Sequence, residues 1–130
     1  MSQEEDKRRA ATAALVYIKD GIALGVGTGS TVDLLIDALP AYASKLTAVV
    51  SSSERSTRRL EAAGIKVSEL GQVGELDLYI DGADEATKHL HLIKGGGGAL
   101  TREKILAAAA RRFVCIIDET KLVATLGRFP

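Results

Sequence analysis

The alternation of short apolar runs with helix-forming stretches along the chain constrains its fold most strongly. Runs of about five apolar and often β-branched residues are typical of buried strands, and apolar residues repeated every three or four positions are typical of helices. Strands that alternate with helices form right-handed βαβ units. The pattern therefore predicts an α/β domain with a doubly wound, mainly parallel sheet and helices on both faces, which is Rossmann-like in the loose sense.

The elements follow from these periods and from the turn residues between them. Helices are expected at residues 3–18, 30–39, from the serine turn at 51–53 to 60, and at 100–110, with one or two helical turns at 118–126. Strands are expected at 22–26, 46–50, 65–67, 76–80, 89–93 and 113–117. Pro40 and Gly64 mark helix ends, residues 71–74 form a turn, and Ser52 or Ser53 caps the helix that follows. The strand order does not follow from the sequence.

Composition narrows the class of protein. The 130 residues suffice for one domain, and 17 Lys and Arg residues balance 17 Asp and Glu residues. This neutrality gives no reason to expect nucleic acid or an anionic membrane surface as a partner. No apolar run approaches the roughly 20 residues that span a bilayer, and the first residues lack the apolar segment of a signal peptide. The single cysteine, Cys115, is expected to be a small core residue, and one cysteine cannot form a disulfide framework. We therefore expect a protein of the reducing cytoplasm.

A glycine-rich turn follows the first predicted strand. Its residues are Gly27, Thr28, Gly29, Ser30 and Thr31. They would place backbone N–H groups and hydroxyls at a helix N-terminus, an arrangement that binds anions. The turn lacks the last glycine of the dinucleotide fingerprint and the lysine of a P-loop, so a small phosphate ester fits better. A tight turn with a helix cap is the open alternative, and residues 51–53 likewise either cap a helix or wall the same cleft.

Two carboxylates follow the strand predicted at 76–80. Asp81 and Asp84 are three residues apart in a predicted loop, so both can face one cleft. Mutual repulsion would raise the pKa of one of them, and such a pair can move protons between neighbouring hydroxyl and carbonyl oxygens. The open alternative is a turn in which the Asp side chains bond to the backbone.

A lysine and a run of glycines come next. The run consists of Lys94 and then Gly95, Gly96, Gly97 and Gly98. Consecutive glycines indicate positive φ angles or close approach to a ligand, and their N–H groups beside an ammonium suit an oxyanion that develops during a reaction. Glu103, near the start of the next helix, would stay ionised and could remove a proton α to a carbonyl. His89 and His91 alternate on a strand, and a strand pair is favoured over a metal site because no third His or Cys lies nearby.

Taken together, these motifs closely resemble ribose-5-phosphate isomerase, type A. The resemblance runs from about residue 7 to 130, with the motifs in the family's order, and includes Glu85 after the Asp81 motif and Lys104 after Glu103. It implies the interconversion of D-ribose 5-phosphate and D-ribulose 5-phosphate through a cis-enediolate, in the non-oxidative pentose phosphate pathway. It also implies that the isomerase uses no cofactor or metal and that the full-length family forms a homodimer.

The resemblance carries roles over by position. Glu103 resembles the base that moves a proton between C1 and C2. Asp81, assisted by Asp84, resembles the group for ring opening and for proton transfer at the oxygens. Lys94 and the glycines behind it resemble the groups that stabilise the enediolate oxygen. Substrate contacts are implied for Lys7, Thr28, Gly29, Ser30, Thr31, Asp81, Gly82, Ala83, Asp84, Lys94, Gly95, Gly96, Gly97 and Lys121.

Two departures from the family are visible. Gly98 stands where the family more often has Ala, which should loosen the loop slightly. Family members also continue into a smaller α+β domain, so residues 1–130 are expected to form a single Rossmann-like catalytic domain without it. That difference leads us to expect exposed apolar surface that favours self-association or low stability.

Three alternative functions remain. An amino-sugar-phosphate deaminase or a phosphogluconolactonase would not be expected to combine the Lys94 glycine run with Glu103. A non-catalytic sugar-phosphate sensor would have no use for a base at Glu103, and it is set apart by binding without turnover. A truncated isomerase that binds substrate weakly and does no chemistry is the third.

Overall fold

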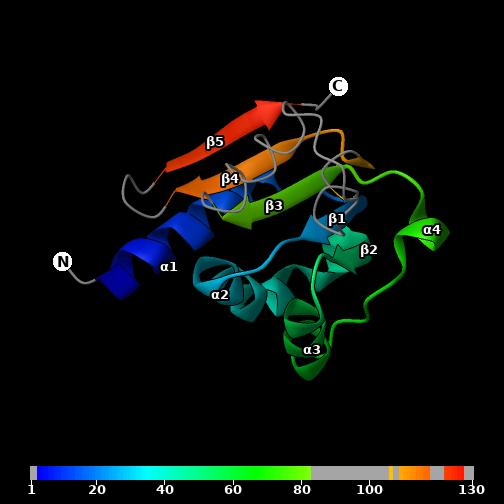
Figure 1. Cartoon of the computed structure of the whole chain (residues 1–130), viewed down its shortest axis with the longest axis horizontal. Coiled ribbons are helices and arrows are strands. Elements are labelled where there is room, and N and C mark those ends of the chain that lie inside the picture. Colours follow the sequence, from blue (N-terminus) through cyan, green and yellow to red (C-terminus); the bar gives the residue numbers. More distant parts are fainter. Residues whose placement is uncertain (1–2, 83–105, 107–108, 118–121, 128–130) are drawn as a thin grey trace, which may run out of the picture.

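The structure is a computed structural model and describes residues 3–82, 106, 109–117 and 122–127. Within these residues the sheet consists of β1 (Ile22–Val26), β2 (Leu46–Ser51), β3 (Leu78–Gly82), β4 (Phe113–Ile117) and β5 (Leu122–Gly127). Their spatial order is β2-β1-β3-β4-β5 (Figure 1). Neighbours from β2 to β4 are parallel, and β5 runs antiparallel to β4. The predicted mainly parallel α/β sheet is confirmed.

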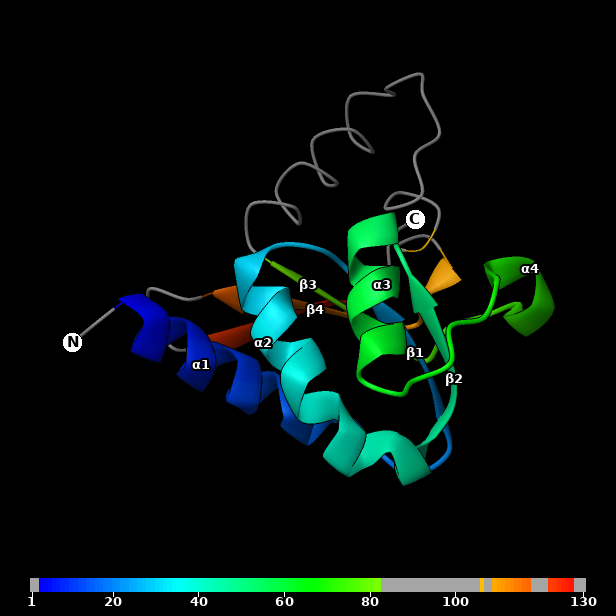
Figure 2. The ribbon, with the colours of Figure 1, turned by 90° about the horizontal axis from the view of Figure 1, so that it is seen from below.

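The described helices lie mostly before the third strand. They are α1 (Gln3–Ala14), α2 (Ser30–Ala38), α3 (Glu54–Ala62) and the short α4 (Leu70–Val73). Two 3₁₀ helices, η1 (Leu15–Tyr17) and η2 (Leu39–Lys45), continue α1 and α2. Figure 2 shows α1, α2 and α3 together over one side of the sheet, with α4 set apart beyond the β2 edge.

The first face of the sheet packs against α1, α2 and α3. Its core joins Leu24 of β1 and Ile80 of β3 to apolar side chains of the helices. The apolar residues that recur at helical spacing within the predicted helices 3–18 and 30–39 are buried, namely Ala10, Ala14, Leu15 and Ile18, and Val32, Leu35, Ile36 and Leu39. Burial of these stripes is what holds α1 and α2 on the sheet.

The second face has its own core. Side chains of successive strand residues point to opposite faces, so Tyr79 of β3 lies on the side away from Leu78 and Ile80. It packs on Phe113 of β4 with the ring centroids 4.9 Å apart. Leu106, which is helical, is buried in the same cluster, so helices cover both faces as predicted. Cys115 also lies here, 6% exposed, which confirms it as a core residue.

Several predicted boundaries are confirmed. The strands at 22–26 and 113–117 match β1 and β4 at both ends. Ser53 is the N-cap of α3, because its side chain accepts a hydrogen bond from Ser56 N at 3.1 Å. Gly64 has φ +85° just after α3, as a left-handed helix stop requires. The α-helix expected to end at 39 does end at Ala38, but Pro40 does not stop the helical chain, which continues as η2 to Lys45.

Other expectations are wrong. Residues 65–67 are not a strand: Ile65 is buried in the first core, but the segment contacts β2 through a single described backbone bond, from Ser68 N to Val49 O. Residues 71–74 are mostly helical, because Glu69 and Gln72 form a capping box that starts α4. The strand expected at 76–80 starts two residues later, since Leu76 only bridges to Ala110.

The end of the chain differs most from the prediction. Helical turns were expected at 118–126, but residues 122–126 belong to β5, which pairs with β4 from Ile117↔Leu122 to Phe113↔Gly127. Pairing with the exposed edge of β4 satisfies backbone groups that an edge strand leaves open, and the β-branched Val123 and Thr125 suit a strand. The strand predicted at 89–93 and most of the helix at 100–110 lie outside the described residues.

Candidate active site

The carboxyl ends of β1 and β3 meet at one edge of the sheet. The chain leaves β1 outward through α2 to β2, whereas β3 has β4 on its other side. The strand order therefore reverses between β1 and β3, and ligands of open α/β sheets bind at such a switch point. The glycine turn follows β1, and Asp81 and Gly82 end β3, so two predicted site motifs lie at this point (Figure 1).

Backbone bonds tie the start of the glycine turn to β3 and the end of β1 to the serine turn. Gly27 N donates to Ile80 O of β3 at 2.8 Å, and Ser52 N donates to Val26 O at 2.9 Å. Gly29 is the N-cap of α2 and has φ +117°, a conformation that side-chain-bearing residues rarely adopt. α2 then begins at Ser30, so the turn presents the helix N-terminus at the sheet edge, as an anion site requires.

Asp81 is fully buried beside this turn. Its Oδ1 accepts hydrogen bonds from Thr28 N at 3.1 Å and from Gly82 N at 2.8 Å. Its Oδ2 accepts from the Tyr79 hydroxyl at 2.7 Å. Three donors directed at one carboxylate stabilise its ionised form against the cost of burial. The open alternative of an Asp bonded to backbone is therefore partly realised, since two of the donors are backbone N–H groups.

Gly27 makes the approach of Asp81 possible. A Cβ built on Gly27 would lie 2.0 Å from Asp81 Cγ and 2.1 Å from its Oδ1. The carboxylate therefore occupies the space that a side chain at Gly27 would take. This is close backbone approach, so the glycine is required here by packing.

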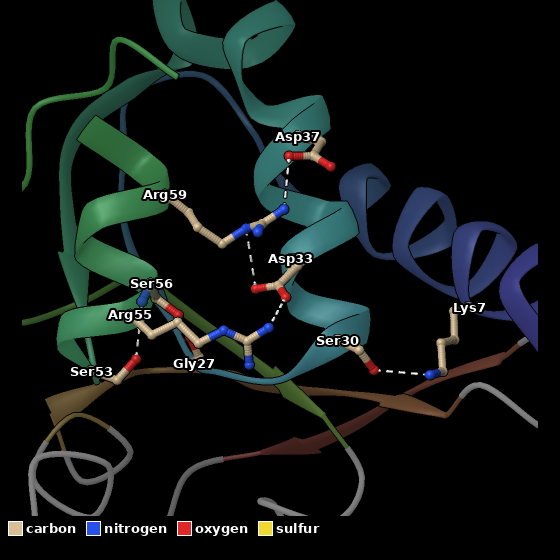
Figure 3. Close-up of polar contacts among 9 residues, drawn as sticks. All are labelled: Lys7, Gly27, Ser30, Asp33, Asp37, Ser53, Arg55, Ser56 and Arg59. Carbon is tan, nitrogen blue, oxygen red and sulfur yellow. Dashed lines mark hydrogen bonds and ion pairs between the residues drawn. The ribbon is translucent and has the colours of Figure 1, made fainter. Parts of the chain in front are cut away.

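Lys7 reaches the same edge from α1. Its Nζ donates to Ser30 Oγ at 2.9 Å, which brings an ammonium to the first residue of α2 (Figure 3). The cation adds to the positive end of the α2 dipole. Of the residues predicted to contact substrate, the structure thus brings together Lys7, Thr28, Gly29, Ser30, Thr31, Asp81 and Gly82.

The serine turn at the end of β2 forms the next part of the edge. Ser51 Oγ donates to Ser53 O at 2.7 Å and Ser53 caps α3, so turn formation and capping account for two of the three serines. Ser52 Oγ is buried and has no hydrogen-bond partner in the described part of the chain. Ser56, in the first turn of α3, is fully buried and donates from Oγ to Gly27 O at 2.6 Å (Figure 3).

An ionic network joins α2 to α3 behind the turn. The Asp33 side chain, only 10% exposed, pairs with Arg55 and, at 3.4 Å, with Arg59 Nε. Arg59 also reaches Asp37 Oδ1 at 3.5 Å (Figure 3). Because Asp33 and Asp37 lie one turn apart on α2, and Arg55 and Arg59 one turn apart on α3, this network ties the two helices together along their length.

The remaining predicted site residues lie outside the described residues. They are Ala83, Asp84, Lys94, Gly95, Gly96, Gly97, Glu103 and Lys121, and His89 and His91 lie there as well. The carboxylate pair, the glycine nest and the base at Glu103 therefore stay predictions.

Sequence reasoning missed two residues of the site. Tyr79 stands out in the sequence only as part of an apolar strand, although its spacing of two from Asp81 places both side chains on one face of β3. Ser56 belongs to no predicted motif, although it shares the buried side of α3 with Leu60, four residues later. In both cases the signal was the spacing to another buried residue on the same face, two residues along a strand for Tyr79 and four along a helix for Ser56.

The described residues hold no group of three or more His, Cys, Asp or Glu side chains suited to a metal ion. Among the same residues, none of the helices has the length and apolar character needed to cross a bilayer.

Comparison with known proteins identifies the family. The model of ribose 5-phosphate isomerase A (phosphoriboisomerase A) matches residues 48–130. Ribose-5-phosphate isomerase A of Francisella tularensis subsp. novicida (strain U112) is 60% identical over 129 residues, which are 99% of this chain and 58% of the relative. The chain thus spans less than two thirds of the length of such relatives.

Solved structures agree. Ribose 5 phosphate isomerase A from Neisseria gonorrhoeae matches with a TM-score of 0.75 and 40% identity over 99% of this chain and 58% of that one. A D-ribose-5-phosphate isomerase in complex with phospho-erythronic acid matches with a TM-score of 0.75 and 38% identity over 94% of this chain and 55% of that one. The resemblance drawn from the motifs is confirmed, and the chain belongs to the ribose 5-phosphate isomerase A family.

Proposed function

We propose that this chain is an aldose-ketose isomerase that interconverts D-ribose 5-phosphate and D-ribulose 5-phosphate. One observation carries the proposal beyond family membership: the buried Asp81 carboxylate is hydrogen-bonded to the glycine turn at the N-terminus of α2. An acid-base group and an anion-binding helix end therefore share one crevice. A sugar with a phosphate at one end and a reacting carbonyl at the other needs both.

The phosphate would bind at the start of α2. The N–H groups of this first turn and the Lys7 ammonium next to Ser30 supply oriented donors and positive charge. One structural relative, a D-ribose-5-phosphate isomerase in complex with phospho-erythronic acid, supports the proposal, because that ligand is itself a phosphate ester with a carboxylate.

The reaction moves a proton from C2 of the open-chain aldose to C1, through a cis-enediolate. In the proposal Glu103 removes the proton from C2 and returns it to C1, while Lys94 and its glycines stabilise the negative oxygen. Asp81, assisted by Asp84, moves protons during ring opening and between O1 and O2. Substrate and product are isomers, so the balance requires no external oxidant or reductant.

Asp81 is suited to this part by its environment. Its two oxygens are held in place by the Thr28 and Gly82 amides and by the Tyr79 hydroxyl. A fixed carboxylate loses little entropy when it exchanges a proton with a bound hydroxyl. The five strands, which lie between residues 22 and 127, form one sheet. This supports the proposal that one catalytic domain carries these groups.

A coupled assay for ribulose 5-phosphate formed from ribose 5-phosphate tests the function. The wild-type chain is compared with Glu103→Gln and with the matched control Glu61→Gln, which changes an exposed glutamate of α3. We expect turnover by the wild type and the control and a loss of at least about a hundredfold in Glu103→Gln, the lower range for a general base. Saturable binding of ribose 5-phosphate without turnover would instead favour a sensor or an inactive isomerase.

A further inference from the structure

Helix α3 has a second link to the site besides the ionic network at Asp33. Ser56, fully buried in its first turn, donates its hydroxyl proton to Gly27 O at 2.6 Å. Ser56 is itself fixed, because its own N–H is bound by the capping side chain of Ser53 at 3.1 Å. The hydroxyl is thus held at a defined place behind the glycine turn (Figure 3).

The acceptor of that bond, Gly27 O, belongs to a peptide unit that also contacts Asp81. Gly27 C=O and Thr28 N–H are the two polar groups of one planar trans peptide and point in opposite directions. The carbonyl end accepts from Ser56, and the amide end donates to Asp81 Oδ1 at 3.1 Å. Ser56 and Asp81 are therefore connected through a single rigid plane, although they lie on α3 and β3.

This peptide needs an outside contact to hold its orientation. Gly27 cannot carry a side chain, since a Cβ would lie 2.0 Å from Asp81 Cγ. The same glycine leaves the peptide that follows it unusually free to rotate. A rotation would direct the Thr28 N–H away from the carboxylate. A strong hydrogen bond on the carbonyl opposes the rotation, and by polarising the peptide it also strengthens the N–H as a donor.

We propose that Ser56 is a positioning residue for the Asp81 carboxylate, acting through the Gly27–Thr28 peptide. The role of Asp81 in turnover rests on the proposed function, whereas the link between Ser56 and Asp81 does not. The link predicts a property of Asp81 that can be measured without substrate: loss of the Ser56 hydroxyl weakens a donor to the ionised carboxylate and raises its pKa relative to the wild type.

Other groups near Asp81 must stay constant in such a test. In the described part of the chain, the titratable groups next to it include the Tyr79 hydroxyl, bonded to Oδ2, and Cys115, its register partner on β4. Lys7 lies at the other end of the glycine turn, on Ser30. Substitutions at Ser56 change none of these.

The experiment is a carboxyl ¹³C NMR titration of Asp81 in the whole chain, with the resonance assigned by its loss in Asp81→Asn. Ser56→Ala removes the hydroxyl, and Ser56→Cys nearly keeps the volume but gives up most of the donor strength. Ser56→Thr keeps the hydroxyl. The matched control is Thr57→Ala, which removes the neighbouring hydroxyl of α3, bonded at 3.0 Å to Ser53 O and not to the glycine turn.

We expect the Asp81 pKa to rise by about half a unit in Ser56→Ala and Ser56→Cys, and to keep its wild-type value in Ser56→Thr and Thr57→Ala. An unchanged titration in both Ser56→Ala and Ser56→Cys would overturn the proposal. An equal shift in Thr57→Ala would overturn it too, because it would reduce Ser56 to a general part of α3. Absence of turnover by the wild-type chain would contradict the proposed function alone, because the titration of Asp81 needs no turnover.

Discussion

Gly27 and Asp81 are packed so closely that a Cβ on Gly27 would lie 2.0 Å from the carboxylate carbon of Asp81. Gly27→Ala must therefore displace the Asp81 carboxylate or the turn, and it breaks the bond from Thr28 N. We expect a loss of about 1–3 kcal/mol in the free energy of unfolding, as in overpacked cores, together with loss of isomerase activity. Urea denaturation and the coupled assay measure the two effects.

The control for that substitution is Gly71→Ala. Among the described residues, nothing lies within 4 Å of a Cβ built on Gly71, which is inside α4. Alanine there should leave stability unchanged or raise it by about 0.4–1 kcal/mol, because it restricts the unfolded chain. Equal destabilisation by both substitutions would mean that Gly27 has no special relation to Asp81.

Lys7→Gln tests the anion site at α2. The Lys7 ammonium is bonded to Ser30 Oγ at 2.9 Å, at the helix end where we propose that phosphate binds. Removing the charge should raise KM for ribose 5-phosphate about tenfold, which corresponds to about 1.4 kcal/mol, and leave kcat within about twofold. Lys19→Gln, at an exposed position outside the site, should change neither constant. A lowered kcat with unchanged KM in Lys7→Gln would contradict the phosphate assignment.

Asp33→Ala tests the network between α2 and α3. The substitution removes a nearly buried carboxylate and leaves Arg55 and Arg59 without it, but both guanidiniums are about half exposed and water screens their charge. We therefore expect a modest loss of about 1–2 kcal/mol in urea denaturation. Glu54→Ala, which removes the exposed 3.4 Å pair with Arg58, should cost less than about 0.5 kcal/mol. The opposite ranking would show that the Asp33 network does not hold the two helices.

Tyr79→Phe isolates one donor of the carboxylate. It removes the 2.7 Å bond to Asp81 Oδ2 while keeping the ring that packs on Phe113. The loss of a hydrogen bond to a charged, buried group should cost about 1.5–3 kcal/mol of unfolding free energy. Tyr42→Phe changes a partly buried ring of the first core and should stay within about 0.5 kcal/mol of the wild type. Thermal or urea unfolding of the two variants side by side compares their losses of unfolding free energy, and equal losses would contradict the role given to the Tyr79 hydroxyl.

The sequence allowed the elements around the site to be predicted where local signals were strong. The strand 22–26 and the glycine turn after it combine an apolar run with glycines, and Ser53 and Gly64 are strong helix caps and stops. The period of 3.6 residues predicted a helix at 3–18, and the apolar residues at helical spacing from Ala10 to Ile18 are buried in α1 and in η1 with its C-cap. These features depend on residues that are close in the chain.

The features that the sequence did not predict depend on contacts between residues far apart in the chain. Residues 122–127 form β5 on the available edge of β4, and the β-branched Val123 and Thr125 were too weak a local signal to reveal this pairing. β3 begins at Leu78 because Asp77 binds β1 with its side chain as well as its backbone: Ala23 N donates to Asp77 Oδ2 at 2.8 Å. The bond from Ser56 to Gly27 O spans 29 residues, so no short motif could reveal it.

The most direct test of the whole account is ¹H NMR of ribose 5-phosphate incubated with this chain in D₂O. Proton transfer through an enediolate predicts that ribulose 5-phosphate forms and that part of it carries deuterium at C1, because the carboxylate base exchanges its proton with solvent. Failure to form ribulose 5-phosphate, or product that carries no deuterium, would contradict the account.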